Sequence, residues 1–270
     1  MRILFDNNAF AYLSQEPQRV GLLNHLKELV DCRKVEVVGS CTMLEELAGL
    51  SKSDFTRYLN SVSLYEELTN GKILKPWNEL VRQEGEQLRP VLYENSIFDK
   101  STVQKLFSLF KDRSQPISIF NEAYTQRQSY KKDMDEASQD VLSDPCLINK
   151  PNKAIIEGYK DWSTNFDRNA QDFFVDLFKV KANISYKELP HIAAFLGYIL
   201  TRIYECSSLG LANRDTDLYD RAHFTDAAVV DILVTNDEVF IRTCLRVSYR
   251  SFDVIRTDDL ASLIERWHAT

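Results

Sequence analysis

Four acidic residues in separate segments have the types and spacing needed to hold a divalent cation. Asp6 follows the apolar run RILF at 2–5, and Asp237 follows the apolar run DILVT at 231–235. Glu46 lies early in an expected helix at 41–50, and Asp220 opens another at 217–230. Clustered carboxylates raise each other's pKa unless a cation neutralises them. All-oxygen ligation suits Mg²⁺ or Mn²⁺ rather than zinc, so we predict one or two such ions.

Each of these carboxylates has an alternative interpretation. Asp6 and Asp237 stand where helix-capping aspartates also occur. Glu45 is an equally acidic neighbour of Glu46. Three other aspartates near Asp220 are alternatives to it: Asp215, Asp217 and Asp226. Of these, Asp217 could be a helix cap or an additional ligand.

Polar neighbours could support such a centre. Asn8 and Thr235 carry short polar side chains that could orient the carboxylates or a metal-bound water. His223 follows Asp220 by one helical turn and should face the same way. A lone histidine of this kind is more often a partly buried structural residue than a ligand. We therefore place Asn8, Thr235, His223 and Asp217 in supporting positions.

The order of expected elements explains how distant acids could meet. An apolar run at 2–5, a helical periodicity at 20–30 and a strand-like run at 34–38 predict a strand–helix–strand unit. Helices at 217–230, 237–245 and 258–267 alternate with strands at 231–235 and 252–256. This alternation predicts an α/β fold with a parallel sheet. Ligands of such sheets bind beyond the carboxyl ends of the strands, where Asp6 and Asp237 stand.

The middle of the chain has a different pattern. Helical periodicities with few β-branched runs cover 55–68, 77–95, 101–112, 170–182 and 189–205. We therefore predict a core made of both chain ends, residues 1–65 and 208–270, interrupted by a mostly helical insertion at 66–207.

The segments LFDNNAF, LEEL and DLYDRAHFTDAAVVDILVTND, taken in order, resemble the PIN-domain family of metal-dependent ribonucleases. The resemblance covers the two chain ends. It implies a three-layer α/β/α core and makes Asp6, Glu46, Asp220 and Asp237 both metal ligands and catalytic residues. It also implies that a metal-activated water hydrolyses phosphodiester bonds of single-stranded RNA, leaving a 5′-phosphate. The span from Glu46 to Asp220 is longer than compact members of the family use, and the insertion is not explained by the family.

Two basic stretches are candidates for contact with nucleic acid. Arg242, Arg246 and Arg250 follow Asp237 closely, with Tyr249 and Arg256 nearby. A second, aromatic and basic group lies in the insertion: Tyr124, Arg127, Tyr130, Lys131 and Lys132. Arginine and aromatic side chains suit phosphate contact and base stacking. An ion-paired, solvated helix face is the alternative, and for the second group it is the favoured one.

Composition bounds the remaining possibilities. The 270 residues carry a formal net charge of −7, which disfavours bulk electrostatic binding of nucleic acid without excluding a local contact. The five cysteines are scattered without a CxxC pair, so we predict neither disulfides nor a zinc site. No apolar run approaches the about 20 residues of a membrane span, and the N-terminal apolar run is too short for a signal peptide. We expect a soluble, cytoplasmic protein without a membrane partner.

Other functions stay open at this level. A non-catalytic RNA- or protein-binding module on the same scaffold is the main alternative. A haloacid-dehalogenase-type phosphotransferase also begins with a strand and an aspartate, but it needs a second aspartate where this chain has Asn8. An antitoxin-like protein partner and a homo-oligomer are compatible with the sequence.

Overall fold

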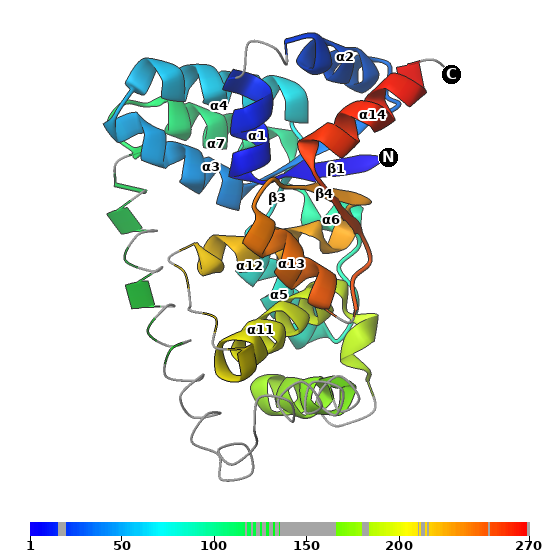
Figure 1. Ribbon diagram of the computed structural model, residues 1–270. Helices are drawn as coiled ribbons and strands as arrows, with labels where there is room; N and C mark the ends of the chain where they lie inside the picture. Colours follow the sequence, from blue (N-terminus) through cyan, green and yellow to red (C-terminus); the bar gives the residue numbers. More distant parts are fainter. Residues whose placement is uncertain are drawn as a thin grey trace.

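A five-stranded, all-parallel sheet forms the centre of the computed structural model (Figure 1). In spatial order the strands are β3, β2, β1, β4 and β5, spanning Ile73–Leu74, Glu36–Ser40, Arg2–Phe5, Ile232–Val234 and Asp253–Ile255. Ile3 of β1 pairs with Ile232 of β4, so the two ends of the chain meet in the middle of the sheet. The predicted α/β class with a parallel sheet is confirmed.

The structure describes most but not all of the chain. The described residues are 1–15, 20–116, 166–179, 184–209, 216–247 and 249–268, together with 211, 214 and single positions between 118 and 135.

Helices cover both faces of the sheet. One face packs against α1 (Asn7–Gln15), α2 (Val20–Asp31), α3 (Cys41–Ala48), α4 (Phe55–Thr69), α7 (Lys100–Lys111) and α14 (Thr257–His268). The other packs against α6 (Tyr93–Ser96), α11 (Pro190–Leu209), α12 (Asp217–Asp226) and α13 (Glu238–Arg246), with α5 (Trp77–Gln87) behind α11. Short 3₁₀ turns lie at Gly49–Lys52, Tyr186–Glu188 and Ala227–Val229.

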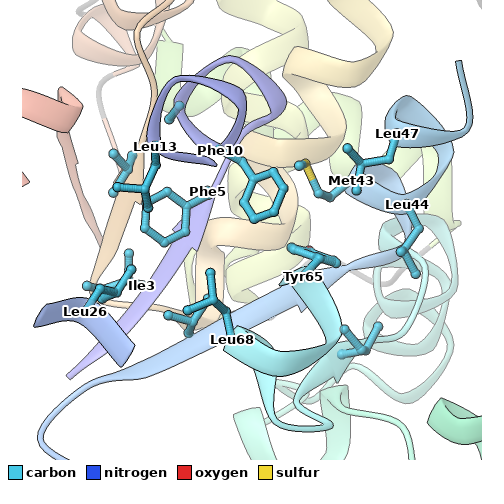
Figure 2. Packing of buried hydrophobic residues seen from close by; sticks show 14 of the residues in the cluster. Ile3, Phe5, Phe10, Leu13, Leu26, Met43, Leu44, Leu47, Tyr65 and Leu68 are labelled. Carbon is cyan, nitrogen blue, oxygen red and sulfur yellow. The ribbon is translucent and has the colours of Figure 1, made fainter. Parts of the chain in front are cut away.

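The alternation of side chains along β1 assigns them to the two cores. Ile3 and Phe5 are buried on the α1 face, where they pack with Phe10, Leu13 and other residues shown in Figure 2. Leu4 is buried on the opposite face, in the cluster that includes α12 and α13. Burying one such side chain stabilises the fold by about 1.5 to 3 kcal/mol. β1 is therefore held firmly in the centre of the sheet, and its carboxyl end is a rigid support for Asp6.

Several boundaries differ from those expected, and two of the differences have a clear physical cause. The second strand begins at Glu36 rather than at residue 34, because Lys34 and Val35 still form turn hydrogen bonds to Leu29 at the end of α2. The helical periodicity at 77–95 is broken after α5, where Leu88 has a left-handed backbone with φ of 51°. Pro90 follows and cannot donate a helical hydrogen bond, so the chain turns before α6 begins.

The range predicted as an insertion is closely connected to the sheet. It supplies the edge strand β3, and its helices α7 and α11 contribute buried residues to the two faces. A strand of two residues carries no periodicity that a sequence pattern can detect.

The longest described helix is α11, with 20 residues, and it carries the buried charged residues Arg202 and Glu205.

Among the described residues no helix is long and apolar enough to cross a membrane.

Candidate metal and catalytic site

The four acidic residues singled out in the sequence meet in one pocket at the carboxyl edge of the sheet. Asp6, Glu46, Asp220 and Asp237 line a cavity of about 230 Å³, together with Asn7, Asn8, Thr216, Tyr219 and His223. The carboxylates come from four segments: the ends of β1 and β4, and helices α3 and α12. The structure therefore brings the predicted set together, with Asn8 and His223 beside it.

Asp6 is positioned by the junction of β1 and α1. Its backbone N–H donates to the Val234 carbonyl at 3.0 Å, which extends the pairing of β1 and β4 by one residue. One carboxylate oxygen accepts the Ala9 N–H at 2.7 Å, and the other accepts the Thr235 hydroxyl. Asp6 thus caps α1, as the alternative interpretation held, and it also lines the pocket. Thr235 orients it, in the supporting position predicted for that residue.

Asp237 combines the same two features at the end of β4. Its Oδ1 accepts the N–H groups of Val239 and Phe240, each at 2.8 Å, and so caps α13. Its side chain is still 20% exposed and lines the pocket. These N–H groups and Arg214 outweigh the effect of burial and hold the pKa of Asp237 below its ordinary value. A helix-capping carboxylate therefore stays charged here.

Of the two adjacent glutamates on α3, Glu46 lines the pocket. Helix α3 starts at the Ser40 cap, which accepts the Met43 N–H. Glu46 Oε2 lies 2.6 Å from His223 Nε2. Glu45 is absent from the lining residues, and burial, followed by the neighbouring charge of Asp226, raises its pKa to about 7.

Helix α12 separates the rival aspartates. Asp220 faces the pocket, whereas Asp226, six residues further along the helix, lies outside the lining and accepts the Thr42 hydroxyl at 3.0 Å. Asp217 is buried and accepts hydrogen bonds from Arg202 and Arg214, so its oxygens are already engaged. Asp215 lies outside the described residues.

Arg214 is a member of the site that sequence reasoning missed. Its Nη1 lies 2.9 Å from Asp237 Oδ2, its Nη2 contacts Asp220, and its Nε lies 3.3 Å from Asp217. No spacing rule singles out this arginine, because it belongs to a loop rather than to a periodic element. The several aspartates that follow Arg214 in the sequence could have pointed to it, because buried acids require a nearby positive charge.

The buried carboxyl groups differ in how readily they ionise. Burial raises the pKa of Asp6 to about 6, although the His223 charge and the Thr235 hydroxyl oppose the rise. Burial also raises the pKa of Asp220 well above its ordinary value, and the Arg214 guanidinium offsets only part of this. Full ionisation of the four carboxylates therefore requires more positive charge than Arg214 and His223 provide.

His223 supplies one of those positive charges. Burial lowers its pKa, but Glu46, through its charge and its hydrogen bond, and then Asp6 raise it to about 9. The imidazole is thus protonated at neutral pH and pairs with Glu46. The predicted supporting residue His223 thus lies in the pocket as the partner of Glu46.

The donor chemistry of the pocket fits Mg²⁺ or Mn²⁺, since its acids are all carboxylates of the kind these ions prefer. The arrangement, however, is not that of an assembled chelate. Among the described residues no group of three or more acidic, histidine or cysteine side chains is disposed to hold a metal ion. Arg214 and His223 engage three of the four carboxylates instead. Cation binding would therefore require these pairs to open.

The predicted substrate arginines do not gather at the pocket. Arg242 is exposed and bonds the Glu238 carbonyl in its own helix. Arg246, about 12 Å along α13 from its start, pairs with the buried Glu205. Arg250 donates to the carbonyls of Phe252 and Cys244. It lies with Asp231 and Asp253 at the amino ends of β4 and β5, whereas the pocket lies at the carboxyl ends of the strands.

The aromatic and basic group of the middle segment is not placed by the structure. Tyr124, Arg127, Tyr130 and Lys131 lie outside the described residues. Lys132 is a described helical position.

The fold and the pocket define an α/β protein with a parallel sheet and an acidic site beyond its strands. Comparison of the chain with protein-family models, with curated proteins and with solved structures gave no match.

Proposed function

We propose that this protein is a Mg²⁺- or Mn²⁺-dependent nuclease that hydrolyses phosphodiester bonds of single-stranded RNA. One observation carries the proposal: four carboxylates from four distant segments converge on one pocket at the carboxyl edge of a parallel sheet. Burial of several acids together is unfavourable without positive charge, and here Arg214 and His223 pair with three of the four carboxylates. A divalent cation would supply the further positive charge. The PIN-like identity of the core rests on the same residues and is part of the proposal.

The residues have distinct roles in this proposal. Asp6, Glu46, Asp220 and Asp237 would hold one or two divalent cations. When bound, such cations activate a water molecule and stabilise the leaving oxygen of a phosphodiester. Thr235 holds Asp6 in place, and the N-terminus of α13 holds Asp237, so two of the carboxylates are fixed before any ion arrives.

The test is cleavage of end-labelled single-stranded RNA with Mn²⁺, with Mg²⁺ and with EDTA. The wild type and Asp6→Asn are compared, with Asp172→Asn as the matched control because that aspartate is 71% exposed and outside the pocket. We expect cleavage that requires metal, is lost in Asp6→Asn and persists in Asp172→Asn. Metal-dependent cleavage by Asp6→Asn at the wild-type rate would overturn the proposal. Single-stranded and duplex DNA of the same sequence, run in parallel, define the substrate class.

A non-catalytic binding module is the second candidate, and the ion pairs of Arg214 with Asp220 and Asp237 favour it. In such a module the internal cation would permanently balance the acids. Nucleic-acid binding without hydrolysis at millimolar Mn²⁺ or Mg²⁺ would favour this second function.

A further inference from the structure

Arg214 makes the contacts that a cation would make in the pocket. Its guanidinium bridges Asp220 and Asp237, which belong to different elements, and its Nε reaches Asp217. Two of these three carboxylates are proposed metal ligands. Oδ1 of Asp237 caps α13, which leaves Oδ2 as the oxygen available to an ion. Arg214 Nη1 contacts this Oδ2 at 2.9 Å.

The charges explain why the guanidinium occupies this position. Burial lowers the pKa of Arg214, but Asp220 and Asp237 outweigh that effect and raise it above its ordinary value. The side chain is 26% exposed and contacts two carboxylates that line the pocket, so it is not enclosed in the core.

Asp217 sets the position of Arg214. It accepts the Arg214 backbone N–H at 2.7 Å and the Nη2 of Arg202 at 2.8 Å. Arg202 in turn pairs with Glu205 at 2.6 Å, and both side chains are at most 1% exposed. Asp217 is therefore fixed by a buried network and acts as a positioning residue for the arginine.

We propose that Arg214 is an internal competitor of the divalent cation, held over Asp220 and Asp237 by Asp217 and displaced when the ion binds. This inference rests on the proposed function of the pocket. The guanidinium contacts two of the four proposed ligands, Asp220 and Asp237. Asp217 belongs with the competitor rather than with the metal.

The test measures Mn²⁺ binding alone, by titration calorimetry and by the electron paramagnetic resonance signal of free Mn²⁺, without substrate. Arg214→Gln removes the competing charge, and we expect the dissociation constant for Mn²⁺ to fall about tenfold or more. Arg82→Gln is the matched control, because Arg82 is 67% exposed and paired with Glu86 away from the pocket. It should bind Mn²⁺ as the wild type does.

Asp217→Asn distinguishes a positioning role from ligation by the sign of its effect. Release of Arg214 should tighten Mn²⁺ binding, whereas loss of a ligand would weaken it. Because Asp217 is buried, Arg214→Lys serves as a second variant: it keeps the charge but loses the forked contact, and should bind Mn²⁺ with intermediate affinity.

The outcomes separate this inference from the proposed function. Equal or weaker Mn²⁺ binding by folded Arg214→Gln, with the wild type binding Mn²⁺, overturns the competitor role and leaves the metal site intact. Absence of Mn²⁺ binding by both proteins at millimolar metal overturns the metal site and the competitor with it.

Discussion

Two buried acidic centres in this protein are built differently. Glu84, between α5 and α11, is fully buried and accepts the N–H groups of Val91 and Ile192, each at 3.0 Å, with His191 Nδ1 at 2.9 Å. In the pocket at the sheet edge, acids face one another and are balanced by Arg214 and His223. Backbone donors cannot leave Glu84, while side-chain cations can move. The first centre is therefore structural, and the second is suited to exchanging its counter-charge.

The largest expected difference between the two centres is in activity. Asp220→Asn should reduce metal-dependent RNA cleavage at least a thousandfold, equivalent to about 4 kcal/mol of transition-state stabilisation. Its free energy of unfolding should change by about 1 kcal/mol or less, because Asn keeps the shape and removes a carboxyl whose ionisation burial opposes. Single-turnover cleavage and urea unfolding measure the two quantities. Cleavage within a few fold of wild type would remove Asp220 from the catalytic set.

Glu84→Ala should have the converse effect. It leaves the N–H groups of Val91 and Ile192 buried without an acceptor and opens a cavity beside His191. We expect a loss of about 3 to 5 kcal/mol in the free energy of unfolding. Residual folded protein, assayed below its unfolding midpoint, should bind Mn²⁺ with wild-type affinity. A stable Glu84→Ala protein would show that the centre between α5 and α11 is not structural.

The pairing of His223 with Glu46 predicts a pH dependence of stability. The pKa of His223 is about 9 in the folded protein against 6.5 as its ordinary value. The folded state binds the proton more tightly, so the stabilisation is full below about pH 6.5 and is lost as the pH rises through 9. The loss should be at most about 3.4 kcal/mol, from the difference of about 2.5 between the two pKa values.

Thermal unfolding in EDTA from pH 6 to pH 10 measures this loss, with His223→Gln as the comparison. Between pH 6 and pH 10, the unfolding temperature of the variant should fall less than that of the wild type, because the variant lacks the pair of His223 and Glu46. Parallel declines in the two proteins would contradict the pairing.

The smallest expected effect concerns RNA contact outside the pocket. Arg242 is exposed, whereas Arg246 pairs with Glu205, Arg250 donates to backbone carbonyls and the nearby Arg256 pairs with Glu238. Arg242→Glu should weaken binding of uncleaved RNA roughly threefold at moderate salt and reduce the salt slope by about 1. Fluorescence anisotropy in EDTA at several salt concentrations measures both. Binding equal to that of Arg82→Gln would remove Arg242 from the nucleic-acid surface.

Much of the fold was predictable from local patterns. The apolar run before Asp6, the alternation of helix and strand after residue 217 and the helical periodicities of α4, α7 and α11 all correspond to observed elements. These signals are local because side-chain periodicity records which face of an element is buried. Strand β3 left no such signal, since its two residues belong to the sheet only through pairing with β2.

The acidic site was predictable as a set but not in its pairings. Acids that follow parallel strands share one edge, so the sequence alone places Asp6 and Asp237 near each other. The separation of Glu46 from Glu45, and of Asp220 from Asp217, depends on the direction of each side chain in the packed helix. The contacts of Arg214 and His223 join residues far apart in the chain. Sequence determined which residues carry the charge, and tertiary structure decided which charges neutralise one another, because Coulomb energy depends on distance and burial, which only the packed chain defines.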